Sequence, residues 1–107
     1  MDITTVEMVS YRLKAGITTH QVNATHLGVN QLLQQQPGFY YRSLSCDEAG
    51  QWFDIAYWKD MNCAKLAGDA FMGSSAGQAL IALIDSDTMT MRHMEVATET
   101  NGETCAA

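Results

Sequence analysis

The residues of this sequence best suited to chemistry are an arginine, an aspartate and three separated histidines. Arg42 and Asp54 lie in two strand-like segments on either side of a short turn. A guanidinium can hold the carbonyl or carboxylate of a ligand while an aspartate orients it. The simpler interpretation is an ion pair at a sheet edge, worth about 0–1 kcal/mol when exposed. His20, His26 and His93 follow neither an HxH nor an HxxxH spacing, so the sequence predicts no metal site.

His26 falls on an apolar helical stripe with Val22, Val29 and Leu33. A lone histidine in such a stripe is most simply a core residue that is hydrogen-bonded to a carbonyl. If His26 instead faces a pocket, burial lowers its pKa and leaves the imidazole neutral near pH 7, able to act as a base. Glu7, in the first strand-like segment, is the other candidate base.

The helices and strands expected around these residues follow one another in a recognisable order. The patterns predict a strand over 5–13, a helix over 18–36, hairpin strands over 39–46 and 51–58, a helix over 61–72, a short helix over 76–84, a turn at 85–87 and a strand over 88–96. The resulting β-α-β-β-α-β order is the ferredoxin-like, split βαβ pattern of an α+β domain, with a four-stranded antiparallel sheet. A single domain over 1–97 is expected, followed by a polar C-terminal tail over 98–107.

The hairpin turn sets the register of the two central strands. The turn DEAG followed by Gln51 is an odd-length loop over 47–51, and it pairs Cys46 with Trp52, Leu44 with Asp54 and Arg42 with Ala56. One face then carries Tyr40, Arg42, Leu44, Cys46, Trp52, Asp54, Ala56 and Trp58. The other face carries Phe39, Tyr41, Phe53, Ile55 and Tyr57. Because both faces are aromatic, we expect the helices to cover one and a second copy of the chain to cover the other.

Composition limits the partners of the chain. Of its 107 residues only 17% are charged, and six Lys+Arg against twelve Asp+Glu give a net charge of −6. An acidic surface argues against a nucleic-acid or an anionic-membrane partner. No apolar run approaches the ~18 residues of a membrane span, and the first ten residues do not resemble a signal peptide. The shortage of charge also favours a homodimer, since so short a chain cannot bury all of its apolar surface alone.

The cysteines indicate a reducing compartment. Cys46, Cys63 and Cys105 are odd in number and widely spaced, which fits neither a disulfide framework nor a CxxC metal site. We therefore expect a cytoplasmic protein.

Four segments carry a resemblance to a known family. They are VEMVSYRLKAG at 6–16, QQQPGF at 34–39, AGQWFDIAYWKD at 49–60, and the spacing from Ala64 to Phe71. In this order they resemble the antibiotic-biosynthesis-monooxygenase-like (ABM-like) proteins of the dimeric α/β-barrel superfamily. The resemblance implies a homodimer whose two sheets face each other as a barrel. It also implies a pocket between sheet and helices in each subunit.

The same resemblance bears on activity. Some members of the family degrade haem, with an Asn on the first strand, a Trp near the end of the third and a His on the second helix. Trp58 matches the Trp, but 5–13 contains no Asn and 61–72 no His, which disfavours haem degradation. Other members are cofactor-independent oxidases of quinol-like compounds that use Trp, Asn, Arg and Tyr. Trp58, Arg42 and Tyr11 could take such parts here.

Three hypotheses of function remain open at this point. The first is a monooxygenase that needs no cofactor and acts on an aromatic or quinol-like compound. Its candidate catalytic residues are His26, Trp58, Arg42 and Asp54. Its candidate ligand-binding residues are Glu7, Tyr11, Tyr40, Trp52, Trp58, Phe71, Met91 and His93. The second is a non-catalytic binder of an apolar ligand such as a fatty acid, which seven adaptable methionines would suit. The third is a fully packed barrel that serves only assembly.

Overall fold

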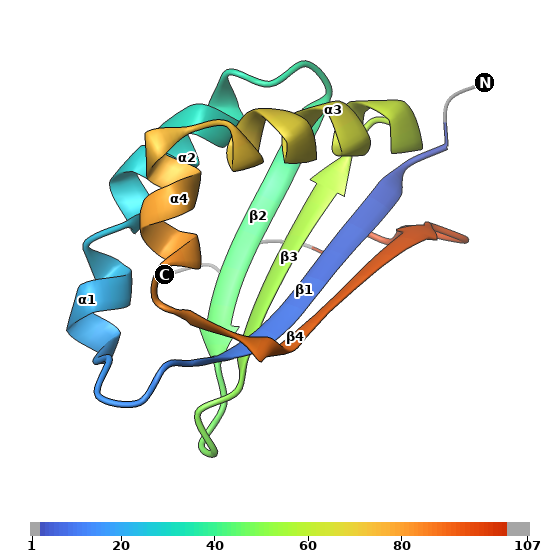
Figure 1. Ribbon diagram of the computed structural model, residues 1–107. Helices are drawn as coiled ribbons and strands as arrows, with labels where there is room; N and C mark the ends of the chain where they lie inside the picture. Colours follow the sequence, from blue (N-terminus) through green and yellow to red (C-terminus); the bar gives the residue numbers. More distant parts are fainter. Residues whose placement is uncertain (1–2, 103–107) are drawn as a thin grey trace, which may run out of the picture.

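The computed structural model describes residues 3–102 as one sheet covered on one face by helices (Figure 1). The strands are β1 (Thr5–Leu13), β2 (Phe39–Cys46), β3 (Trp52–Trp58) and β4 (Ile84–Glu95). The helices are α1 (Thr19–Asn23), α2 (His26–Gln34), α3 (Met61–Met72) and α4 (Ser75–Ile81). The sheet is antiparallel in the order β2-β3-β1-β4, so the α+β, ferredoxin-like prediction is confirmed.

The predicted hairpin register is also confirmed. Cys46 pairs with Trp52, Leu44 with Asp54 and Arg42 with Ala56. On the helix-facing side the core is formed by aromatic side chains of the strands packed on small and branched residues of the helices. The buried members are Tyr11, Trp52, Ala56, Trp58 and Ile84 from the strands, and Val22, Val29, Leu33, Ala64, Ala67 and Leu80 from the helices.

A bulge at the start of β2 corrects one face assignment. Phe39 pairs with Trp58 but Tyr41 pairs with Tyr57, so Tyr40 is an extra residue on β2. The bulge turns Phe39 toward the helices, where its ring meets that of Trp58 edge-on at 5.2 Å between centroids. The prediction that Phe39 lies on the opposite face is therefore wrong. Tyr40, at the bulge, is 57% exposed.

The predicted helix over 18–36 is interrupted. α1 begins with a capping box, in which the Thr18 hydroxyl accepts from the Gln21 N–H and the Gln21 side chain accepts from the Thr18 N–H. At Thr25 both the hydroxyl and the backbone N–H donate to the Val22 carbonyl, at 2.7 and 2.9 Å. This tight turn ends the first segment, because the hydroxyl competes for a backbone acceptor. α2 then begins at His26.

The last helix and strand also differ from expectation. The Ser74 hydroxyl caps α4 by accepting from the Gly77 N–H, and the helix ends at Ile81 rather than 84. Ile84 already pairs with Leu13, so the predicted turn at 85–87 lies inside β4. Pairing with β1 overrides the local turn signal, and a register shift opposite Tyr11 accommodates the extra residues.

The helices cover only one face of the sheet (Figure 1). The other side, which we call the open face, carries apolar side chains that the single chain leaves only half-buried. They are Val6, Met8, Phe53, Ile55 and Tyr57. Over residues 3–102, no helix has both the length and the hydropathy that a membrane crossing requires.

Candidate functional site

Polar side chains cross the helix-facing side of the sheet from one edge to the other. In the register, Arg42 on β2 and Glu7 on β1 both pair with Ala56, and Glu7 in turn pairs with His93 on β4. Asp54, on β3, lies beside this line. We call Arg42, Asp54, Glu7 and His93 the polar row. Each strand thus contributes one residue to the polar row. These four side chains are largely or partly buried, so their charges must be paired or neutralised.

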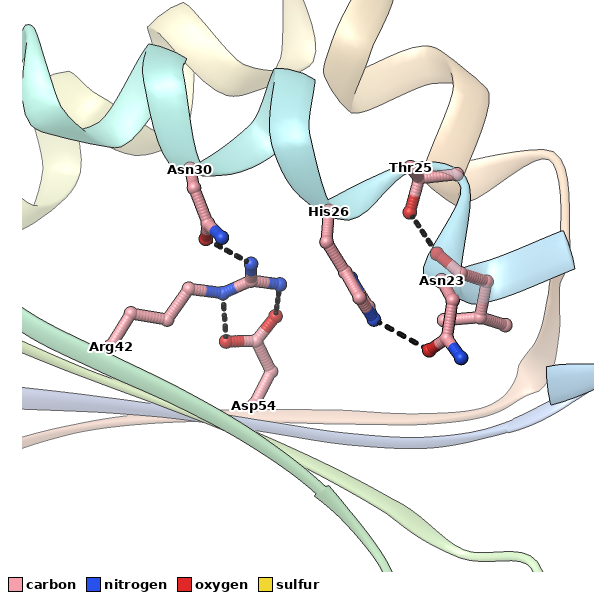
Figure 2. Close-up of polar contacts among 7 residues, drawn as sticks. Asn23, Thr25, His26, Asn30, Arg42 and Asp54 are labelled. Atoms are coloured by element: carbon pink, nitrogen blue, oxygen red, sulfur yellow. Dashed lines mark hydrogen bonds and ion pairs between the residues drawn. The ribbon is translucent and has the colours of Figure 1, made fainter. Parts of the chain in front are cut away.

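The strongest contact of the polar row joins Arg42 to Asp54 (Figure 2). Arg42 Nε donates to Asp54 Oδ1 at 2.9 Å, and its Nη2 donates to Oδ2 at 2.6 Å. Its Nη1 donates to Asn30 Oδ1 of α2, also at 2.9 Å. The two side chains are only 5% and 19% exposed. The pair is therefore bidentate and largely buried, and it is not the exposed edge pair of the simpler interpretation.

His26 lies above the same region, at the first residue of α2 (Figure 2). Its Nε2 is 3.0 Å from Asn23 Oδ1. Because an amide oxygen only accepts, Nε2 carries the proton and Nδ1 keeps its lone pair. Nδ1 is buried and has no hydrogen-bond partner among the described residues. Burial lowers the pKa of His26, and the charge of Arg42 adds to that effect, which favours the neutral imidazole.

Tyr11 places a buried hydroxyl near the same pair. Its side chain is 1% exposed, and its hydroxyl has no partner among the described residues. Burial raises the pKa of Tyr11 well above its usual value, and the carboxylate of Asp54 raises it further. The phenol therefore stays protonated and keeps an O–H to donate.

Trp58 lies apart from this cluster. It is four residues beyond Asp54 on β3, about 13 Å along the strand at 3.3 Å per residue. Its side chain is almost fully buried against Phe39, and its indole N–H has no partner among the described residues. These contacts are those of a core residue at the far end of the sheet.

Glu7 and His93 form the second contact of the polar row. His93 Nε2 is 2.7 Å from Glu7 Oε2, and both side chains are partly buried. Burial raises the pKa of Glu7, against the opposing effect of the hydrogen bond to His93. The pair spans β1 and β4, on the side of Asp54 away from Arg42.

The remaining predicted ligand residues are dispersed. Trp52 is buried opposite Tyr11, and Phe71 packs against the core from α3. Tyr40 and Met91 are more than half exposed. A surface hollow of about 260 Å³ at the β2 edge does reach the polar row, since Arg42 and Asn30 line it together with Gln34, Phe39, Tyr40 and Tyr41.

Two site residues, Asn23 and Asn30, were not singled out from the sequence. Both hydrogen-bond the predicted residues His26 and Arg42. Their positions relative to His26, at −3 and +4, place all three on one side of the helix predicted over 18–36. This spacing of polar residues, in a stretch without charges, is the sequence signal by which Asn23 and Asn30 could have been found. No three His, Cys, Asp or Glu side chains within 3–102 are grouped to hold a metal ion.

Comparison with known proteins supports the fold alone. No family model matches the chain, and no curated protein matches it in sequence. Among solved structures it is similar to SnoaB, a cofactor-independent oxygenase from Streptomyces nogalater, at 17% identity and a TM-score of 0.71, covering 94% of this chain and 99% of that one. It is also similar to a dimeric ferredoxin-like protein of unknown function from Thermobifida fusca, at 10% identity and a TM-score of 0.73, covering 90% of this chain and 93% of that one.

A Caulobacter crescentus protein provisionally assigned as an antibiotic biosynthesis monooxygenase gives 13% identity, a TM-score of 0.72, and coverage of 91% of this chain and 92% of that one. At these identities the shared property is the backbone. The chain has the ferredoxin-like fold of the ABM-like proteins, which confirms the resemblance at the level of fold.

Proposed function

We propose that this chain binds a small aromatic or quinol-like molecule over the polar row and oxygenates it without a cofactor. The observation that carries this proposal is the lone pair of His26 Nδ1, which is buried, has no hydrogen-bond partner within residues 3–102, and is fixed in its tautomer by Asn23. A neutral imidazole beside an arginine suits removal of a proton from an acidic substrate. The likeness in fold to a cofactor-independent oxygenase agrees with this choice.

In the proposed reaction His26 Nδ1 takes a proton from an activated C–H or phenolic O–H. The resulting carbanion or phenolate gives one electron to O₂, and the radical pair combines to a peroxide. Loss of water then leaves a carbonyl, so that one oxygen atom enters the product and the other leaves as water. Arg42 uses three of its five N–H groups on Asp54 and Asn30, and its charge stabilises the substrate anion. The Tyr11 O–H serves as a further donor.

A homodimer is part of the proposal. The half-buried apolar residues of the open face need a cover, and the similar Thermobifida fusca protein is described as dimeric. A cytoplasmic location is likewise proposed, on the free thiol of Cys46. Cys105 lies outside the described residues.

The alternative of a fatty-acid binder has little support. The hollows at the β2 edge and near the β2–β3 turn measure about 260 and 250 Å³, and each is lined by an arginine. Spaces of that size suit one or two rings better than a long acyl chain.

Oxygen uptake on a panel of anthrones and hydroquinones tests the proposal. We expect His26→Gln to lower kcat by about 10²–10⁴-fold, the usual contribution of a general base. His20→Gln, at an exposed position of α1, is the matched control. Because the pKa of His26 is lowered, the rate should fall only when the pH drops below 6.5, the ordinary pKa of a histidine. Absence of turnover by the wild-type protein, or equal rates for both variants, would contradict the proposal.

A further inference from the structure

A second hollow lies at the opposite end of the sheet from Trp58, beside the β2–β3 turn. It measures about 250 Å³. Its lining combines an apolar wall with two cations and three small or polar residues. They are Leu13, Ile17 and Trp52, then Arg12 and Lys14, and finally Thr19, Cys46 and Gly50.

The guanidinium of Arg12 is held in place by a backbone carbonyl. Its Nη2 donates to the carbonyl of Ala49 at 2.6 Å, an uncharged acceptor. Asp85 is its cross-strand partner, yet the two form no ion pair in the part of the chain that the structure describes. Gly50 gives the guanidinium room, since a Cβ there would lie 3.3 Å from Nη2.

Backbone hydrogen bonds hold Lys14 in place on the rim of the same hollow. Its N–H donates to the Leu83 carbonyl at 2.9 Å, and its own carbonyl accepts from the Ile17 N–H at 3.1 Å. The turn that carries Lys14 therefore also sets the apolar wall at Ile17. Two of only six cations in a chain of net charge −6 thus meet at one hollow. Against an acidic background, such a rim attracts anions selectively.

The hollow adjoins the helix-facing core. Trp52, on its wall, is the cross-strand partner of Tyr11 on one side and of Cys46 on the other. We infer that this hollow binds a small aromatic carboxylate, with the anionic group between Arg12 and Lys14 and the ring against Leu13, Ile17 and Trp52. An apolar wall of this kind does not suit inorganic phosphate. The inference stands on its own contacts and does not require the oxygenation reaction.

Isothermal titration with 2-naphthoate and its uncharged analogue 2-naphthamide tests this site. We expect the carboxylate to bind at least about tenfold more tightly, with an advantage that shrinks between about 0.02 M and about 0.5 M salt. Lys14→Gln alone should weaken naphthoate binding several-fold, and Arg12→Gln combined with Lys14→Gln by at least about tenfold. Lys65→Gln, at an exposed position of α3, is the control with matched charge.

Four outcomes would overturn the inference. Three are equal binding of carboxylate and carboxamide, no binding of either, and naphthoate binding that Lys14→Gln leaves at the level of Lys65→Gln. The fourth is displacement of naphthoate by an equal concentration of inorganic phosphate, because the apolar wall would then play no part in binding. Arg12→Gln also removes the contact with Ala49. If circular dichroism shows that the double variant is unfolded, the Lys14→Gln result alone decides the test. None of these titrations depends on oxygen uptake, so this inference and the proposed function can fail separately.

Discussion

The two sides of the sheet differ in what they bury and in what they leave exposed. The helix-facing side buries the charges of Arg42 and Asp54 beneath α2, whereas the open face leaves apolar side chains such as Ile55 and Tyr57 half-exposed. Burying an ion pair gives little net stability, and well-packed apolar residues would often serve the fold as well. This difference agrees with the proposals that the charged side binds a ligand and that the apolar side meets a second copy of the chain.

The largest expected effect comes from breaking the buried pair. Asp54→Leu leaves the Arg42 guanidinium buried without its carboxylate, which should lower the free energy of unfolding by about 3–5 kcal/mol. Combining it with Arg42→Leu should recover most of that loss, because no charge then remains unpaired. Urea denaturation of the three proteins measures both changes. If the double variant is as unstable as the single one, the pair is needed for the fold itself.

A change on the open face should act on assembly instead. Ile55→Asp places a charge where we expect the second copy, and should weaken dimerisation by at least about 2 kcal/mol, roughly thirtyfold in Kd. Leu66→Asp, on the exposed side of α3, is the control. Light scattering over a dilution series measures the dissociation. A wild-type protein that is monomeric at micromolar concentration would contradict the dimer, as would equal behaviour of the two variants.

The smallest expected effect concerns Glu7, the β1 member of the polar row on the helix-facing side. Because its folded-state pKa is raised above 4.5, the folded protein holds this proton more tightly than the unfolded chain does. Its contribution to stability is thus complete below that value and is lost as pH rises through the raised pKa. The melting temperature of the wild type should therefore fall relative to Glu7→Gln between about pH 4 and about pH 7. Glu95→Gln, at an exposed position of β4, is the control.

The central strands were predictable because turn length and side-chain parity agree. The odd-length loop at Gly50 sets the pairing of Cys46 with Trp52, and the pairing then propagates by alternation along both strands. The interruption at Thr25 was not predictable, because it depends on a single hydroxyl competing for the Val22 carbonyl. The early start of β4 was hidden by turn-forming residues that pairing with Leu13 overrides.

The candidate site was predictable in part. Arg42 and Asp54 followed from the register as diagonal neighbours, but their burial depends on α2 and on Asn30, which no strand pattern indicates. Trp58 shares a face with Asp54, yet parity along a strand does not report the distance that separates them. Its contact with Phe39 depends on the bulge, which alternation in the sequence does not reveal.

That bulge has a consequence for comparing chain lengths. Tyr40 is an extra residue in the ladder of paired residues. Without it, Phe39 would still pair with Trp58 and Tyr41 with Tyr57, and successive side chains would alternate between the two faces without a break. A related chain one residue shorter at this point would keep both faces of its sheet, so an alignment must open its gap at position 40 to match equivalent positions. Deletion of Tyr40 is accordingly a shortening of this chain that its β-sheet should tolerate.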